Sequence, residues 1–177
     1  MEPALPQLQM RLESLENLPE LSLPEGIALT TATSSDALAF ANLMALCYDD
    51  STWTPERVHK EFLENRMVPV SFLLYRGDEL LATASAANHS HHPGLGYVHY
   101  VAAKPDSGVS GLGLQATLAA LHEFKKWGLT SSLLETDDFR LPAIVTYLKL
   151  GYVPYNTHES HAARWEALKP QLQRFFK

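Results

Sequence analysis

The stretch that decides the fold runs from Tyr97 to Trp127 and reads YVHYVAAKPDSGVSGLGLQATLAALHEFKKW. Its first residues are rich in aromatic and β-branched side chains, which predicts a strand over 97–101 that ends before Pro105. Its last part, Leu112 to Trp127, is rich in alanine and leucine and is followed by Gly128, which predicts a helix. A loop with three glycines, 107–113, therefore leads from a strand directly into a helix.

This glycine loop can bind an anion. The first N–H groups of a helix have no partner within the helix, and they lie at the positive end of its dipole. Glycine lets the backbone approach a phosphate closely. The hypothesis is that the loop binds the phosphates of a nucleotide-like cofactor. The alternative is an ordinary strand-to-helix turn that needs glycine for its dihedral angles.

Composition limits the possible partners. A chain of 177 residues fits one domain with a full core. A net charge of −6 and a pI near 5.7 argue against nucleic acid or an anionic membrane as a partner, and they allow a cationic amine substrate. Cys47 is the only cysteine, so no intrachain disulfide forms. The start, Met1 to Ala4, lacks the features of a signal peptide, and we expect a cytoplasmic protein.

The rest of the chain predicts an α/β (α+β) domain with a mixed sheet. Residues 1–26 contain four prolines and predict an irregular leader with one short element around 8–15, packed on a domain that spans 27–177. Strands are expected at 27–32, 70–75, 79–86, 97–101, 132–136 and 152–155. A first helix is expected to end at 46 and to be capped by Ser34, Ser35 or Asp36, and further helices are expected at 54–66, 112–127 and 142–150. The last segment, 161–174, contains Trp165, which is expected to cover the sheet.

Three stretches in order resemble the GCN5-related N-acetyltransferase (GNAT) family over roughly residues 27–155. The first is Val101 to Pro105 followed by GVSGLG at 108–113, and the second is LETDD at 134–138. The third is AIVTYLKLGYVP at 143–154, which is similar to the family's helix ending in Tyr-x-x-x-Gly-Phe. The resemblance implies a single-domain fold with a mostly antiparallel sheet, splayed central strands and flanking helices.

The resemblance also implies acetyl-CoA as co-substrate, with no metal. In the family, the backbone of the splayed strand pairs with the pantetheine arm of the cofactor, and the glycine loop holds its pyrophosphate. Carried over to this chain, the pantetheine-binding residues are Val101, Ala102 and Ala103. The pyrophosphate-binding residues are Val109, Ser110, Gly111, Leu112, Gly113 and Leu114.

The sequence departs from the family at three positions. Gly108 stands where the family usually has Arg or Gln, and Ser110 stands where a second basic residue is common. Phosphate binding would then depend on backbone donors and lose charge-assisted contacts, unless a lysine such as Lys104 helps. Arg140 replaces an Asn that contacts the cofactor, and it could instead reach a phosphate. These departures leave open a non-catalytic acyl-CoA-binding or regulatory domain. A dinucleotide-binding domain fits less well, because the glycine loop follows several strands.

Two residues are candidates for the chemistry of acetyl transfer. Tyr147 falls where family members place the general acid that protonates the leaving thiolate, and a tyrosine that packs on the sheet is the alternative. His99 falls where serotonin N-acetyltransferase has a histidine implicated as general base. Strict alternation would place His99 on one face with Tyr97 and Val101. A buried, hydrogen-bonded histidine is the alternative.

Other polar groups are less specific. Glu135 and Asp137 can orient the histidine, bind an ammonium group or be solvated at the strand end. The pair Asp49 and Asp50, with Trp53, lies where the family builds its acceptor pocket, although a helix-capping turn is the simpler interpretation. The histidines at 89, 91 and 92 predict an exposed loop rather than a metal site. The predicted partner is an amine on a small molecule or peptide, and a homodimer is left open.

Overall fold

The structure is a computed structural model that describes residues 5–89 and 91–176. A seven-stranded sheet has the order β2-β3-β4-β5-β6-β1-β7. The strands are β1 (Leu8–Leu12), β2 (Ile27–Thr31), β3 (Val70–Arg76), β4 (Glu79–Asn88), β5 (Gly96–Ala103), β6 (Ser132–Thr136) and β7 (Val153–Tyr155). Only β5 and β6 pair in parallel, as the predicted crossover through a helix requires, and the other neighbours are antiparallel. The α/β fold class with a mixed, mostly antiparallel sheet is confirmed.

The helices are α1 (Ala37–Tyr48), α2 (Pro55–Val58), α3 (Leu112–Lys126), α4 (Leu141–Lys149) and α5 (His161–Leu172). Short 3-10 turns stand before α1 (Ser34–Asp36) and after α5 (Gln173–Phe175), and a π turn (His59–Leu63) continues α2. Thr54 caps α2 as predicted, because its hydroxyl accepts the Arg57 N–H at 3.2 Å. Asp36, one of the three caps expected for the first helix, is the N-cap residue of α1, but its side chain makes no cap hydrogen bond to that helix. Instead, Thr33 and Asp36 form the capping box of the 3-10 turn that precedes α1.

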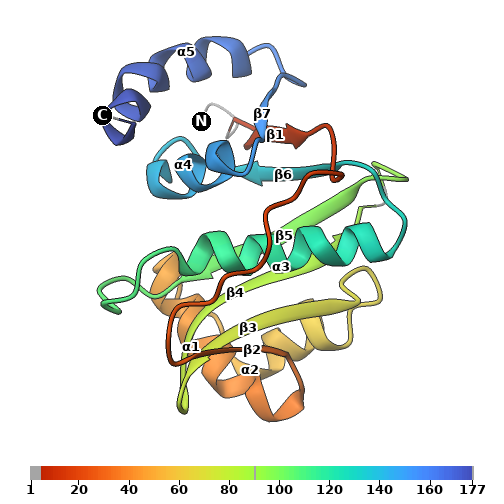
Figure 1. Ribbon diagram of the computed structural model, residues 1–177, viewed down its shortest axis with the longest axis vertical. Helices are drawn as coiled ribbons and strands as arrows, with labels where there is room; N and C mark the ends of the chain where they lie inside the picture. Colours follow the sequence, from red (N-terminus) through yellow and green to blue (C-terminus); the bar gives the residue numbers. More distant parts are fainter. Residues whose placement is uncertain (1–4, 90, 177) are drawn as a thin grey trace.

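Helices cover the sheet on both faces (Figure 1). α3 packs against one face, where Leu118, Phe124 and Val98 belong to one core cluster that also includes residues of α4 and α5. α1 and the π turn pack against the other face through Phe40 and Phe62. None of the helices formed by residues 5–89 and 91–176 has the length and apolar character needed to cross a bilayer.

The N-terminal segment is more regular than the sequence suggests. The short element expected around 8–15 is the strand β1, which lies between β6 and β7 in the sheet. Its residues alternate between the core and the opposite face, with Leu8, Met10 and Leu12 buried. The sequence LQMRL at 8–12 has this alternation, but the prolines around it favour an irregular segment. Residues 1–4, on which the signal-peptide argument depends, lie outside the described residues.

The central strands separate, as the resemblance implies. β5 pairs with β6 only from Gly96 to Val98, opposite Ser132 to Leu134. Further along β5, the three steps from His99 to Ala102 lie opposite only two steps of β4, from Ser85 to Thr83, which is a β-bulge. Tyr100 lies in this bulge with a φ of 44°, an uncommon conformation for a non-glycine residue. The bulge turns β5 away from β6 and opens the space between them.

Candidate active site

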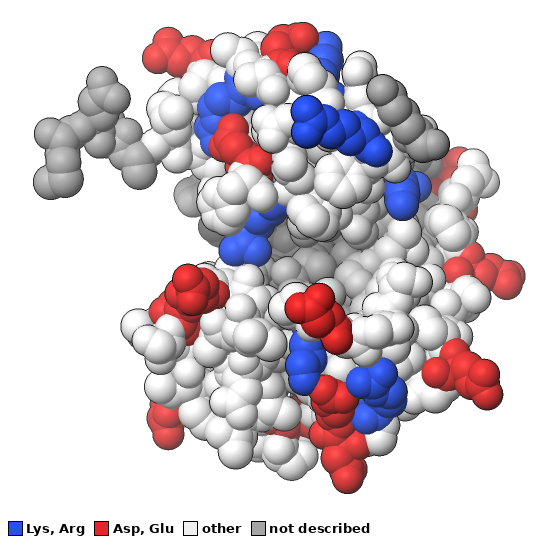
Figure 2. Space-filling view, turned by 90° about the vertical axis from the view of Figure 1, so that its left-hand side faces the viewer, with Lys and Arg blue, Asp and Glu red and all other residues white. Residues whose placement is uncertain are grey.

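A first cavity of about 400 Å³, here called the loop cavity, lies between the end of β5, the glycine loop and α4. The side of the molecule shown in Figure 2 is hollowed across its middle, on the side where the loop, α1 and α4 lie. The predicted cofactor-binding residues that line this cavity are Val101, Ala102, Ala103, Val109, Gly111, Leu112, Gly113, Leu114 and Arg140. Ser110 is the one predicted residue that does not line it.

The glycine loop places N–H groups at the cavity wall. Gly108 and Gly111 have φ values of 73° and 77°, which side chains with a Cβ rarely adopt. The first hydrogen bond of α3 joins the Gln115 N–H to the Gly111 carbonyl at 3.0 Å. The N–H groups of residues 112–114 therefore precede the helical ladder and are available to an anion. This arrangement fits the pyrophosphate of acetyl-CoA.

The end of β5 offers an open backbone edge. The Lys104 N–H donates to Leu81 of β4 at 2.7 Å, so the polar groups of the preceding Ala103 face the other way. On that side the Tyr48 hydroxyl donates to the Val101 carbonyl at 2.9 Å, and Cys47 Sγ lies 3.4 Å from the Ala103 carbonyl. Because β6 has already diverged, this edge can pair with an extended molecule such as a pantetheine arm.

Neither of the two helix residues that contact this edge was assigned a role from the sequence. Cys47 is partly buried and also lines the loop cavity. Burial raises the pKa of its thiol, which keeps it protonated. Tyr48 is the last residue of α1, and the sequence carries no motif that would single it out. Only the packing of α1 against β5 reveals it.

The basic side chains near the loop are already engaged. Lys104 forms an ion pair with Glu79, which also pairs with Arg76 at 2.9 Å. Arg76 in turn donates to the carbonyl of Ser107 in the loop at 3.0 Å. The expectation that Lys104 helps to bind phosphate therefore requires an exchange of partners, and it stays a prediction.

A second cavity of about 230 Å³, here called the splay cavity, opens where β5 and β6 separate. Its wall includes Tyr97, His99 and Tyr100 from β5, Glu135 and Thr136 from β6, and Asp137 just after β6. The residues that line both cavities are Val101, Arg140, Ala143 and Tyr147. These four residues mark the junction at which a group held in one cavity can reach a group held in the other.

Tyr147, the candidate general acid, lies at this junction. α4 places its side chain in the core with 5% of its surface exposed, and its ring packs edge-on against Tyr152 at 6.0 Å. Burial raises the pKa of its phenol above the usual value near 10, and the Arg140 charge opposes this only in part. The hydroxyl therefore stays protonated at neutral pH and can donate a proton to a thiolate.

His99, the candidate base, lines the splay cavity only. Its ring lies 4.5 Å from the Tyr100 ring and 5.6 Å from the Phe62 ring, measured between centroids. Burial lowers the pKa of His99 to about 4, so the imidazole is neutral at pH 7 with a lone pair available. The structure therefore brings His99 and Tyr147 to the wall of one cavity.

The expected face of His99 needs a correction. Strict alternation placed it with Tyr97 and Val101. His99 does lie with Tyr97, since their ring centroids are 6.0 Å apart, but the bulge at Tyr100 shifts the pattern by one residue and separates His99 from Val101. Tyr97 and Tyr100 pack with the cluster of α1 and the π turn, whereas Val101 packs with the clusters beneath α3. The extra residue of a bulge reverses the side on which the following side chains lie.

The N-terminal strand contributes polar groups that the sequence did not reveal. Gln9 lies opposite Glu135 in the β1–β6 pair, and its Nε2 donates to Glu135 Oε1 at 3.0 Å. The other oxygen of Glu135 accepts the Tyr97 hydroxyl at 2.8 Å. Gln7 donates similarly to Asp137 at 3.1 Å. The β1–β6 pairing alone brings these amides to carboxylates more than a hundred residues away in the chain.

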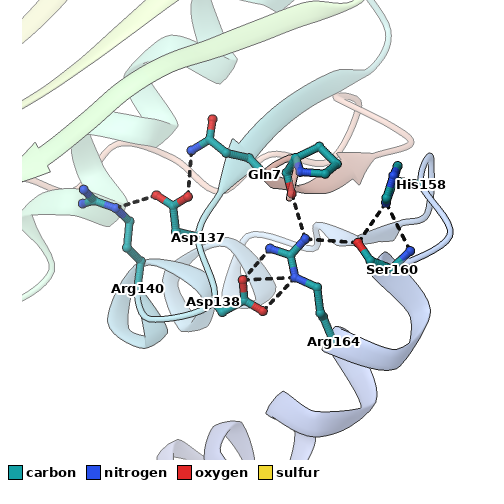
Figure 3. A network of polar contacts seen from close by, with 8 residues as sticks. Gln7, Asp137, Asp138, Arg140, His158, Ser160 and Arg164 are labelled. Atoms are coloured by element: carbon teal, nitrogen blue, oxygen red, sulfur yellow. Dashed lines mark hydrogen bonds and ion pairs between the residues drawn. The ribbon is translucent and has the colours of Figure 1, made fainter. Parts of the chain in front are cut away.

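A polar network connects this segment to the junction (Figure 3). Asp137 accepts from Gln7 and forms an ion pair with Arg140 at 3.2 Å. The Arg140 guanidinium also lies 4.1 Å from the Tyr48 ring centroid. Nearby, Arg164 of α5 binds Asp138 and donates to the Pro6 carbonyl at 2.7 Å. Arg140 is thus fixed between the two cavities, so its predicted contact with a phosphate stays a prediction.

The remaining candidates take structural roles. Asp50 accepts both the N–H and the hydroxyl of Thr52 and pairs with Arg57 at 2.9 Å, and Trp53 is buried under that arginine. The capping-turn interpretation therefore describes Asp50 better than an amine site does. The His89 ring lies 4.7 Å from the Tyr97 ring, measured between centroids and tilted by 53°, beside the loop that contains the other histidines. Within residues 5–89 and 91–176, no three potential ligands come together around a metal position.

Residues 37–152 match the family model described as the acetyltransferase (GNAT) family. This match covers well over half of the chain and includes all the residues that line the loop cavity and, except Gln7, those that line the splay cavity. The chain belongs to the GNAT family. Mycothiol acetyltransferase of Pseudarthrobacter chlorophenolicus is 30% identical over 159 residues, which are 84% of this chain and 49% of that protein. The Nocardia farcinica protein of the same name is 30% identical over 82% of this chain and 52% of its own length.

Solved structures show the same GNAT fold. A GCN5-related N-acetyltransferase from Sphaerobacter thermophilus superimposes with a TM-score of 0.62 at 17% identity, over 85% of this chain and 49% of the other. The chain spans about half the length of the mycothiol acetyltransferases that it matches. Family membership establishes this chain as an acetyltransferase-type domain, and it leaves the acceptor undefined.

Proposed function

We propose that this protein is an acetyl-CoA-dependent N-acetyltransferase that transfers the acetyl group directly to a primary amine of a small molecule or peptide. The observation that carries the proposal is the junction of the two cavities, where Tyr147 lies between a cofactor-sized groove and a polar pocket. The loop cavity fits acetyl-CoA because it joins an open strand edge to the N–H groups at the start of α3.

The residues divide the chemistry as follows. The amine nitrogen in the splay cavity attacks the thioester carbonyl, and a C–N bond forms as the C–S bond breaks. The neutral ring of His99 accepts the proton that leaves the amine, and the Tyr147 phenol donates a proton to the departing sulfur. Because both proton carriers are largely buried, the transfer takes place away from bulk water.

A second candidate function is a non-catalytic acyl-CoA-binding domain. It is favoured by the absence of a basic side chain at Gly108 and Ser110 and by the ion pair that engages Lys104. Such a domain would bind acetyl-CoA without turnover. We expect the protein to act in the cytoplasm, without nucleic acid or membrane as a partner, on the grounds of its charge and composition.

Thermal unfolding with acetyl-CoA, compared with NAD and ATP, tests the cofactor. At a ligand concentration a hundred times the dissociation constant, the gain in stability is about 2.7 kcal/mol. If acetyl-CoA produces no shift, both candidate functions are wrong. A panel of amines with detection of the released thiol then separates the two: turnover with any amine supports the enzyme, and binding without turnover supports the second candidate.

A further inference from the structure

The wall shared by the two cavities carries a positive charge. Of the four described residues that line both cavities, Val101 and Ala143 are apolar, Tyr147 is a neutral phenol and Arg140 is a cation. The proposed function places the reacting thioester beside this wall, because the cofactor occupies the loop cavity and the amine occupies the splay cavity. The charge of Arg140 therefore lies next to the C–S bond that breaks.

Two contacts hold the Arg140 guanidinium in place. Its Nε donates to Asp137 Oδ2 at 3.2 Å, and its Cζ lies 4.1 Å from the centroid of the Tyr48 ring. Asp137 is held in turn by the Gln7 amide at 3.1 Å. Only 24% of the Arg140 side chain is exposed, so water screens its charge incompletely. A cation that is already fixed in position needs no reorganisation when a negative charge forms beside it.

The terminal nitrogens of Arg140 remain available for an anion. Figure 3 shows them pointing away from Asp137, and across residues 5–89 and 91–176 neither has a hydrogen-bond acceptor. The neighbouring Arg164 differs, because its Nη1 donates to the Pro6 carbonyl and its Nη2 binds Asp138. Hydrogen bonds between a guanidinium and an anion are stronger than those between neutral groups. Arg140 thus has donors to spare at the junction of the cavities.

The charge of Arg140 also acts on the groups around the open edge of β5. Burial raises the pKa of Cys47, Tyr48 and Tyr147, and the Arg140 charge opposes this rise at each of them. Cys47 and Tyr48 contact carbonyl groups of that edge. The guanidinium therefore influences both the edge along which a pantetheine arm would extend and the candidate general acid.

Tyr147 alone does not balance the charge of the departing sulfur. As the C–S bond breaks, its electron pair moves to the sulfur, and a thiol has an ordinary pKa of about 8.5. Burial raises the pKa of the Tyr147 phenol above its ordinary value of about 10. Proton transfer from this phenol to a thiolate is therefore uphill, and the sulfur carries negative charge for part of the reaction. A fixed cation beside the sulfur stabilises that charge.

We propose that the Arg140 guanidinium binds the cofactor sulfur and stabilises the negative charge that forms on it, so that Arg140 is a further catalytic residue of the acetyl transfer. The acetyl group passes to the amine nitrogen, whose proton goes to His99, and the thiolate then takes a proton from Tyr147. Exchange with water restores both side chains. The inference rests on the proposed function for the identity of the cofactor, and it assigns Arg140 to the sulfur rather than to a phosphate.

Binding of CoA compared with desulfo-CoA, which has hydrogen in place of the thiol, isolates the contact with the sulfur. If Arg140 lies beside the sulfur, the bound thiol loses its proton at a lower pH than the free thiol does, so CoA binds more tightly as the pH rises. By calorimetry, we expect the ratio of CoA affinity to desulfo-CoA affinity to rise about fivefold or more between about pH 7 and about pH 9.5. In Arg140→Gln this ratio should stay about constant.

Arg164→Gln is the matched control. It also removes an ion pair with a carboxylate just after β6, but Arg164 is not among the described residues that line the two cavities. This variant should keep the rise of the affinity ratio with pH. In the amine panel, we expect Arg140→Gln to lower kcat by about 100-fold, the usual scale for losing one donor to a developing negative charge.

Several outcomes would overturn the inference. An affinity ratio that does not change with pH in the native protein does so, as does a rise that Arg140→Gln retains. Equal loss of affinity for CoA and desulfo-CoA in Arg140→Gln at every pH would place the guanidinium on a phosphate instead. An unchanged kcat in Arg140→Gln would remove Arg140 from catalysis.

The same measurements separate this inference from the proposed function. If the rise with pH is present in the native protein and lost in Arg140→Gln but no amine is acetylated, the contact with the sulfur is supported and only the proposed reaction is wrong. If neither CoA nor desulfo-CoA binds, the proposed function and the inference are both wrong.

Discussion

The loop cavity and the splay cavity are built in different ways. Most of the loop cavity comes from one continuous stretch, 101–114, in which a strand, a glycine loop and a helix start follow one another. The splay cavity combines side chains from β5, β6, α4, the end of α1 and the residues before β1. A site for a shared cofactor can be encoded locally, whereas a site for a particular acceptor depends on segments that meet only after folding.

Tyr147 lines both cavities, so removing its hydroxyl is the most direct test of whether the two cavities act together in catalysis. We expect Tyr147→Phe to lower kcat by about 100-fold or more, the usual scale for losing a general acid, with little change in acetyl-CoA affinity. Steady-state kinetics and calorimetry measure the two quantities.

Tyr152→Phe is the matched control for this change. Tyr152 is fully buried beside Tyr147, and its hydroxyl is hydrogen-bonded to Ser132 at 2.7 Å rather than facing either cavity. Its loss should reduce stability by about 1 kcal/mol and leave kcat near that of the native protein. Equal turnover in Tyr147→Phe and Tyr152→Phe would remove Tyr147 from the mechanism.

Substitutions at two glycines test two different requirements of the loop cavity: the space that acetyl-CoA occupies and the backbone conformation of the loop. A Cβ on Gly113 would lie 3.7 Å from the Ala103 Cβ, an ordinary contact, but it would enter the groove between α3 and β5. We expect Gly113→Ala to weaken acetyl-CoA binding by about tenfold while the melting point is kept, because alanine favours a helix by about 1 kcal/mol over glycine.

Gly111→Ala is the complementary variant. Gly111 has a φ of 77° and open space around its Cβ position, so alanine there is strained without any clash. We expect a loss of stability of about 1–2 kcal/mol, measured by chemical unfolding. If Gly113→Ala binds acetyl-CoA as well as the native protein, the pantetheine arm does not pass between α3 and β5.

The N-terminal strand should affect only the splay cavity. Gln9→Ala removes one hydrogen bond from Glu135, and we expect KM for the acceptor amine to rise by about threefold to tenfold, which corresponds to a net hydrogen-bond contribution of about 0.7–1.4 kcal/mol. The dissociation constant of acetyl-CoA should not change. Gln171→Ala on the exposed side of α5 is the control. A parallel loss of acetyl-CoA affinity in Gln9→Ala would show that β1 supports both cavities.

The smallest expected effect is the pH dependence that the protonation of His99 gives to the stability of the protein. Because burial lowers its pKa to about 4, the ring should stay neutral from pH 8 to pH 5, and NMR titration, with His99→Gln to assign the signal, can follow it. The unfolded chain binds this proton near pH 6.5, so protonation favours unfolding as the pH falls from about 6.5 toward 4. His99→Gln should therefore lose less stability than the native protein over that range. Titration of the His99 signal near pH 6.5 would contradict the burial of its ring.

The fold was largely predictable from the sequence. Helix and strand periodicity with turn residues located the elements from Ile27 onward, and the motifs at 101–113 and 143–154 placed them in order. The segment of β1 was expected only as a short element of unspecified type, because its five residues lie among prolines and its partners β6 and β7 lie far away in the chain. Likewise, the bulge at Tyr100 has no local signal, since it depends on how β5 must curve between β4 and the diverging β6.

The sequence by itself determined a GNAT-type domain, because the glycine loop and its flanking strand and helix are contiguous and depend on local backbone preferences. Only the tertiary structure decided which carboxylates remain without a cation. From the sequence alone, Asp50 and Glu135 are equally plausible binding sites for an amine. In the folded protein, Asp50 pairs with Arg57, whereas Glu135 accepts hydrogen bonds from two neutral donors, Tyr97 and Gln9. The electrostatic character of a carboxylate depends on its neighbours in space, and these come from segments that the order of the chain does not bring together.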